Sequence, residues 1–264
     1  MREAPPQPDR PLIELRGLSK RFGNLVVLRE IDLAFHAGQT TVVIGESGAG
    51  KSVLLRHVIG LTRPDAGEVH FDGRRIDRLP ERRMIDVRKH FGFLFQMSAL
   101  FDSMTVGENV AFPLREHTAH NRRRIDEIVA SKLRMVGLSG LEPKMPAQLS
   151  GGQRKRVALA RAIALEPQAI LYDEPTTGLD PMRADVINEL ILKLKRELQV
   201  TGLVVTHDMT SAYKVADRIV MLHDGRIIAD GSPQDLRRSE DPRVQAFVEG
   251  RADDEALAAL REPA

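Results

Sequence analysis

A glycine-rich loop between an apolar strand and a helix is the feature that most constrains the fold of this chain. Residues 40–44 are β-branched and apolar, which predicts a strand buried in a sheet, and residues 52–59 have helical character. The segment that joins them fits the pattern G-x-x-x-x-G-K-S. Its residues are Gly45, Glu46, Ser47, Gly48, Ala49, Gly50, Lys51 and Ser52. This order of elements predicts an α/β domain with phosphate groups bound at the loop.

The residue types in this loop favour a nucleotide site over a simple turn. Glycines let backbone N–H groups curl around phosphates, and the helix N-terminus adds a favourable partial charge. We expect Lys51 to reach the outer phosphates and Ser52 to supply an oxygen to Mg²⁺. A glycine-rich turn without a ligand is the alternative, and the flanking strand and helix argue against it.

Two acids follow a second apolar strand. Asp173 and Glu174 come directly after residues 169–172, so both are expected at the carboxyl edge of the sheet, where ligands bind in such folds. Asp173 suits the coordination of Mg²⁺, and Glu174 suits the polarisation of an attacking water. Two exposed acids in a turn are the alternative, which the phosphate loop disfavours.

Three more polar residues lie at the ends of predicted elements. Gln96 follows a strand over residues 91–95 and could contact Mg²⁺ or water. His207 follows a strand that ends at residue 206, and it could contact the γ-phosphate or be purely structural. Asp180 precedes a helix and could simply cap it. The residue types alone leave these alternatives open.

A second candidate phosphate site lies about a hundred residues after the loop. Ser150, Gly151, Gly152 and Gln153 follow Leu149 at the predicted start of a helix that extends to residue 165. Exposed N–H groups at a helix start bind phosphate. Since residues 45–52 already hold one nucleotide, this site implies either two nucleotides or two chains that share each nucleotide.

The chain length and composition fit a globular α/β protein. Its 264 residues are 42% hydrophobic and 29% charged, and the absence of cysteine excludes disulfides and a thiolate nucleophile. No apolar run approaches the ~20 residues of a membrane span, and residues 1–11 lack the apolar segment of a signal peptide. Basic clusters at residues 82–83, 88–90 and 122–124 are interpreted as solvated helix faces, so no nucleic-acid partner is expected.

Strands and helices alternate at both ends of the chain, with a helical block between them. This pattern predicts a mostly parallel sheet covered by helices, and residues 219–229 predict a hairpin. One helix of the block is expected to bury a single face, formed by Ile125, Ile128, Val129, Leu133 and Val136. We expect a disordered tail over residues 1–11, one domain over residues 12–248 with a helical insert at about 97–165, and a C-terminal tail over residues 249–264.

The complete set of motifs resembles the ATP-binding subunit of ABC transporters. In chain order, the matching motifs are the Walker A loop at residues 45–52, the Q-loop at Gln96, the signature at residues 149–153, the Walker B strand at residues 169–173 with the catalytic Glu174, the D-loop with Asp180, and the switch histidine His207. The resemblance implies a P-loop NTPase core with a mostly parallel sheet, an antiparallel β subdomain and an inserted α-helical subdomain. It also implies that ATP is the nucleotide and that Phe22 stacks on its adenine.

The resemblance further implies a composite site made by two copies of the chain. Two subunits pair head to tail, so that ATP on Lys51 of one copy is covered by residues 150–153 of the other. Binding closes the dimer and hydrolysis reopens it, which drives a transmembrane permease.

Residues 95–101, 109–118 and 241–247 resemble the Mla-type group of phospholipid transporters. That group implies an MCE-domain lipid-binding protein, a permease and a STAS-domain protein as partners. It places the chain at the cytoplasmic face of a bacterial inner membrane, where it would maintain outer-membrane lipid asymmetry. The alternatives are the ATPase of another importer or exporter, or a soluble ABC-type ATPase that acts on ribosomes or DNA.

Overall fold

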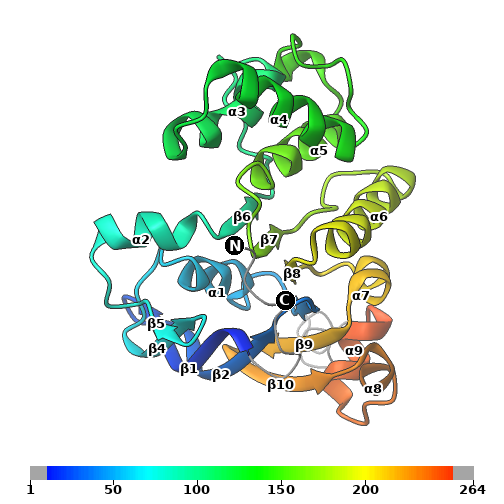
Figure 1. Ribbon diagram of the computed structural model, residues 1–264. Coiled ribbons are helices and arrows are strands. Elements are labelled where there is room, and N and C mark those ends of the chain that lie inside the picture. Colours follow the sequence, from blue (N-terminus) through cyan, green and yellow to red (C-terminus); the bar gives the residue numbers. More distant parts are fainter. Residues whose placement is uncertain (1–10, 252–264) are drawn as a thin grey trace.

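The computed structural model describes residues 11–251 (Figure 1). The predicted N-terminal tail lies outside this range apart from Pro11, which is the first residue of β1. Most of the predicted C-terminal tail, from residue 252 onward, also lies outside the described residues. Within residues 11–251, no helix has both the length and the apolar composition needed to cross a membrane.

A six-stranded sheet in the order β10-β9-β3-β8-β7-β6 forms the centre of the domain. Neighbouring strands are parallel from β6 to β9, and only β10 pairs antiparallel, in the predicted hairpin with β9. The predicted mostly parallel sheet is therefore confirmed. Its strands are β3 (Thr40–Ile44), β6 (Phe91–Leu94), β7 (Ala169–Asp173), β8 (Thr201–Val205), β9 (Arg218–His223) and β10 (Arg226–Gly231).

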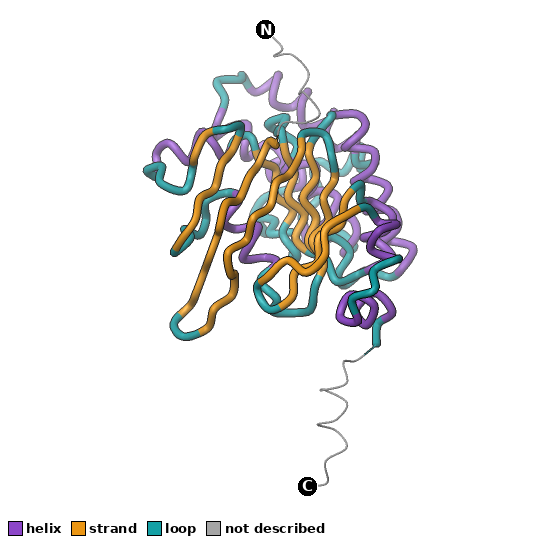
Figure 2. The backbone as a smooth tube through the Cα atoms, turned by 90° about the horizontal axis from the view of Figure 1, so that it is seen from below, coloured by secondary structure: helices purple, strands orange, loops and turns teal. Residues whose placement is uncertain are grey.

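A separate antiparallel sheet confirms the predicted β subdomain. It has the order β2-β1-β4-β5, with β1 (Pro11–Phe22), β2 (Leu25–His36), β4 (Ala66–Phe71) and β5 (Arg74–Arg75). Figure 2 shows the strands of the molecule running alongside one another, with helices on the outside.

The helices divide into those that cover the sheets and those of the inserted block. Figure 1 shows α3, α4 and α5 together at one end of the molecule, away from α1 and the antiparallel sheet. In α4 the predicted apolar face is buried, including Ile125, Val129 and Leu133. The helices are α1 (Lys51–Val58), α2 (Glu81–Arg88), α3 (Val106–His117), α4 (Arg122–Met135), η1 (Pro146–Gln148), α5 (Gly151–Ala162), α6 (Pro181–Leu198), α7 (Met209–Val215), α8 (Pro233–Arg237) and α9 (Pro242–Glu249).

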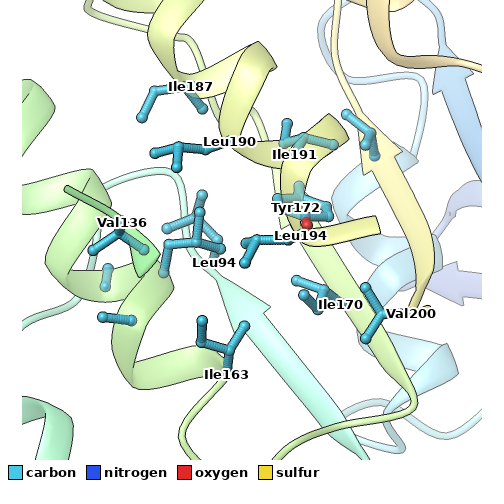
Figure 3. Close-up of a cluster of buried hydrophobic side chains, with 14 of the residues drawn as sticks. Leu94, Val136, Ile163, Ile170, Tyr172, Ile187, Leu190, Ile191, Leu194 and Val200 are labelled. Atoms are coloured by element: carbon cyan, nitrogen blue, oxygen red, sulfur yellow. The ribbon is translucent and has the colours of Figure 1, made fainter. Parts of the chain in front are cut away.

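The parallel sheet is buried on both faces, which gives the domain two hydrophobic clusters. In β7, Ile170 and Tyr172 pack with α5, α6 and the helical block, whereas Ala169 and Leu171 face the antiparallel sheet and α1. Figure 3 shows the first cluster, where Tyr172 lies beside Leu194. Burial on both faces explains the continuous apolar runs of these strands, and it gives the loops at the sheet edge a rigid base.

Candidate functional site

The loop after β3 is shaped by glycines whose backbone conformations other residues rarely adopt. Gly45 has φ 149°, and a Cβ there would lie 2.2 Å from the carbonyl oxygen of Leu222. Gly50 has φ 101° and caps α1 without any side-chain hydrogen bond to the helix N-terminus. The first N–H groups of α1 are therefore available to an anion, as the sequence predicted for a phosphate loop.

Lys51 lies inside this loop rather than in solvent. Its side chain is buried, and Nζ donates to the carbonyl oxygens of Gly45 at 2.7 Å and Glu46 at 2.8 Å. Burial lowers the pKa of Lys51, although the charges of Glu174, Asp173 and Glu46 act in the opposite direction. The loop thus holds the Lys51 ammonium group beside its own backbone, and a phosphate bound by the loop would lie within reach of this group.

Ser52 and Asp173 meet across 121 residues of sequence. Ser52 Oγ donates to Asp173 Oδ1 at 2.8 Å. Burial raises the pKa of Asp173, and this hydrogen bond acts against the rise. A hydroxyl and a carboxylate are the hard oxygen ligands that Mg²⁺ prefers. Since residues 11–251 contain no cluster of three His, Cys, Asp or Glu residues that could hold a metal, a Mg²⁺ here would need water and phosphate oxygens to complete its shell.

Glu174 is a nearly buried acid in a strained backbone conformation. It is 9% exposed and has φ 49°, a region that favours glycine. Its carboxylate accepts hydrogen bonds from Thr177 Oγ1 at 3.0 Å and Thr206 Oγ1 at 3.4 Å, and His207 Nδ1 lies 3.0 Å from Oε1. The structure therefore joins the predicted base and the predicted histidine in one cluster at the carboxyl edge of the sheet.

Gln96 lies close to this cluster through its backbone. Its carbonyl oxygen accepts a hydrogen bond at 3.1 Å from Lys155 Nζ, which also donates to the carbonyl oxygen of Glu174 at 3.3 Å. Sequence reasoning missed Lys155, because it stands in a charged run beside Arg154. The available signal was helical spacing, which puts Lys155 on one face with Gly152 and Leu159, both buried.

The signature residues form the start of α5, as predicted. Ser150 Oγ accepts from the N–H of Gln153 at 3.3 Å, and Gln153 Oε1 accepts from the N–H of Ser150 at 2.9 Å. This reciprocal capping box leaves Ser150 exposed at the helix N-terminus. Because Figure 1 shows α5 in the helical block and α1 beyond the sheet, the signature and the phosphate loop of one chain lie apart.

Asp180 and Phe22 lie at the ends of their elements. Asp180 caps α6, since its carboxylate accepts from the N–H of Arg183 at 3.0 Å, which confirms the cap that the sequence suggested. Phe22 is the last residue of β1 and is 51% exposed. The ammonium of Lys20 lies 5.3 Å from the Phe22 ring centroid, so the ring is accessible and next to a cation.

Comparison with known proteins gives a family and several relatives. The family model described as ABC transporter matches residues 28–177. A Haemophilus influenzae protein named intermembrane phospholipid transport system ATP-binding protein MlaF is 43% identical over 242 residues, which are 92% of each chain. A Mycobacterium leprae protein named probable ribonucleotide transport ATP-binding protein mkl is 43% identical over 239 residues, which are 90% of this chain and 69% of that protein.

A solved structure supports the same comparison at the level of the fold. It is a dimeric ATP-binding cassette in a post-hydrolysis state, bound to ADP and Pi. The alignment has a TM-score of 0.77 and 33% identity, and it covers 84% of this chain and 98% of that chain.

Proposed function

Since this chain belongs to the ABC transporter family, we propose that it is the ATPase subunit of a transporter that moves phospholipids between the inner and outer membranes. The chain binds ATP and hydrolyses it to ADP and phosphate, and this reaction powers transport. The observation that carries the phospholipid assignment is the match to the Haemophilus influenzae protein, which covers 92% of both chains.

The site residues have separate roles in the proposed hydrolysis. Lys51 and the N–H groups of the loop bind the outer phosphates, and Ser52, Asp173 and Gln96 supply oxygens to Mg²⁺. When bound, Mg²⁺ neutralises part of the charge on the phosphate oxygens. Glu174 orients and polarises the water that attacks the γ-phosphorus, and His207 steadies the Glu174 carboxylate beside that phosphate.

Phe22 is proposed to stack on the adenine of ATP. Replacing Phe22 with Ala is expected to weaken ATP binding by about 5- to 150-fold, because stacking of a base on an aromatic ring contributes about 1–3 kcal/mol. Phe22→Tyr keeps the ring and is the matched control. Calorimetric titration with ATP measures both, and equal affinity of the Ala variant and the unaltered chain would remove Phe22 from the site.

The active unit is proposed to be a head-to-tail dimer, in which residues 150–153 of one copy close over ATP on Lys51 of the other. Two observations support this. The capped start of α5 exposes a phosphate-binding helix N-terminus that lies apart from the phosphate loop of its own chain. The similar solved cassette is dimeric.

Ser150→Asp tests this dimer without removing the helix cap. Asp caps helices about as well as Ser, but its negative charge would repel a phosphate on the partner. We expect the ATPase rate to fall at least about 10-fold, and Ser150→Asn, which caps without charge, to remain active. Mixing Ser150→Asp with Lys51→Ala should restore activity, because a mixed dimer has one intact composite site. Two inactive variants that stay inactive when mixed, although they associate, would contradict the shared site.

The remaining partners are proposed from the Mla-type resemblance. They are a transmembrane permease, an MCE-domain lipid-binding protein and a STAS-domain protein, with the chain docked at the cytoplasmic face of the inner membrane. The segment after β6 offers an apolar surface for docking, since Phe95, Met97 and Phe101 are 38%, 87% and 41% exposed.

Affinity purification from detergent-solubilised membranes tests the assignment. The tagged full-length chain is expected to recover a permease and an MCE-domain protein, with phospholipid identified by mass spectrometry. Recovery of ribosomes in place of membrane proteins would overturn the assignment.

Ribonucleotide transport is the second candidate, because the Mycobacterium leprae relative named for it has the same sequence identity to this chain, 43%, as the Haemophilus influenzae relative. This chain covers only 69% of that relative, against 92% of the phospholipid relative. The purified complex distinguishes the two cargoes. Stimulation of its ATPase rate by phospholipid supports the first, and stimulation by ribonucleotides supports the second.

A further inference from the structure

We propose that Lys155 is a positioning residue that fixes the backbone of Glu174 and of Gln96 to the signature helix. The inference rests on the proposed roles of Glu174 and Gln96 in hydrolysis. It starts from a buried lysine that no predicted motif uses. Lys155 is 5% exposed, and its Nζ donates to the carbonyl oxygens of Gln96 and Glu174 at 3.1 and 3.3 Å.

Lys155 has an unusual set of partners for a buried cation. Burial lowers its pKa, and the negative charge of Glu174 acts in the opposite direction. Within residues 11–251, Lys155 forms no ion pair, so the two carbonyl oxygens are the hydrogen-bond acceptors recorded for its ammonium group. A buried ammonium is costly unless it is hydrogen-bonded, and therefore these two carbonyl groups are held close to Nζ.

Glu174 needs such support because its backbone is strained. With φ 49° it adopts a conformation that persists only where the surroundings enforce it. Its N–H donates to the carbonyl oxygen of Val205 at 3.0 Å, and its own carbonyl oxygen accepts from Lys155. These two hydrogen bonds fix the peptide groups on both sides of the Glu174 side chain. The direction of the carboxylate therefore depends on Lys155.

The same helix also holds the segment that follows Gln96. Arg161, six residues after Lys155 on α5, donates to the carbonyl oxygens of Ser98 at 3.1 Å and Ala99 at 2.8 Å. Ser98 and Ala99 both have positive φ, 64° and 47°, so this segment is strained as well. Side chains of α5 thus bind three carbonyl groups of the Q-loop segment and the carbonyl group of the proposed catalytic base.

A displacement of α5 must then move these groups together. The first turn of α5 is the signature, which is proposed to contact the phosphate of the partner copy. Lys155 lies two residues after that motif and links it to Glu174 within the chain. Its Nζ bonds to the backbone carbonyl groups of Gln96 and Glu174 and not to the phosphate loop, so its loss should lower the rate of hydrolysis and leave ATP affinity intact.

Lys155→Met tests the inference, because Met keeps the length of the side chain and removes its hydrogen-bond donors. We expect kcat for ATP to fall by about 10- to 100-fold, the effect of a base misplaced by up to about 1 Å, with the calorimetric Kd for ATP within about 2-fold. Lys155→Arg keeps the donors and should recover part of the rate.

Lys132→Met is the matched control. Lys132 is also 5% exposed, but it lies in α4 and pairs at 3.2 Å with Glu166, which follows α5, and neither residue belongs to the proposed site. This variant should lose stability without a selective loss of kcat. If Lys155→Met lowers kcat no more than Lys132→Met does, or if it weakens ATP binding and leaves kcat at saturating ATP unchanged, the inference is wrong. If Lys155→Met does not fold, Lys155→Gln, which keeps one donor group, is measured by the same criteria.

A double variant separates this inference from the proposed function. Once Glu174→Gln has removed the base, adding Lys155→Met should change the residual rate by less than about 2-fold. The reason is that substitutions of residues that act as a unit do not have additive effects on the rate. A further drop of the full size would show that Lys155 affects the rate independently of Glu174, and it would overturn the proposal that Lys155 positions the base. Full turnover by Glu174→Gln alone would instead refute the proposed role of Glu174.

Discussion

Glu174→Gln is expected to lower the rate of ATP hydrolysis by about 10²- to 10⁴-fold, the usual contribution of a general base. Gln has the shape of Glu but cannot polarise the attacking water as a carboxylate does. The surroundings tolerate the change, since the partners of the carboxylate are the Thr177 and Thr206 hydroxyls and the His207 ring. Hydroxyl groups can accept as well as donate, so the amide keeps hydrogen-bond partners and the fold is retained.

The same variant should bind ATP and remain in the closed dimer, because binding does not require the base. Light scattering with Mg²⁺ and ATP is expected to show a stable dimer, while a phosphate-release assay shows almost no turnover. Glu189→Gln, on the exposed part of α6 and paired with Lys214, is the control for loss of one carboxylate and should hydrolyse ATP normally. Normal turnover by Glu174→Gln would refute its assignment as the base.

Lys51→Ala is expected to weaken ATP binding by about 10- to 150-fold, because a hydrogen bond to a charged group contributes about 1.5–3 kcal/mol. The substitution removes the one ammonium group that lies inside the loop between Gly45 and Glu46. Steady-state hydrolysis should fall with it, since the outer phosphates lose their main cationic contact. Calorimetric titration of the full chain with ATP gives the affinity directly.

A fold check must accompany this variant, because Lys51 is buried and bonds to two backbone carbonyl groups. The melting temperature without nucleotide reports the structural cost alone, and the stabilisation that ATP adds reports binding. Lys89→Ala, which removes a surface lysine paired with Asp86, should match the unaltered chain in both measurements. Unaltered ATP affinity of a folded Lys51→Ala variant would contradict its role at the phosphates.

Elements with a signal in their own residues were predicted accurately, and elements that depend on distant residues were not. The strand over residues 40–44 is β3 with the same bounds, because five β-branched residues before a glycine leave little ambiguity. The strand β1, which extends from Pro11 to Phe22, gives no such signal along its full length. Its second half is polar, and that half is extended because it pairs with β2 and β4. Such pairing depends on residues distant in sequence and leaves no local pattern.

The sequence predicted which residues belong to the candidate site, but it did not predict which of them are in contact. The loop glycines, Lys51, Ser52, Asp173 and Glu174 are recognisable from residue type and position within an element. Their contacts are not, since Ser52 and Asp173 are separated by 121 residues and meet only because β3 and β7 both pair with β8 in parallel. Lys155 illustrates the limit, because a lysine in a charged run gives no sign that it will be buried against Glu174.

Short-range patterns in the chain were enough to predict the kind of domain, the nucleotide chemistry and the residues proposed for each step, because loop shape, helix caps and strand burial depend on neighbours within a few residues. Three features became visible only in the folded domain: His207 meets Glu174, the start of α5 lies apart from the phosphate loop, and Lys155 joins Gln96 to Glu174. These contacts depend on the register of the parallel strands and on where the helical block packs. They are fixed by packing free energy summed over the whole domain, which no short stretch of sequence contains.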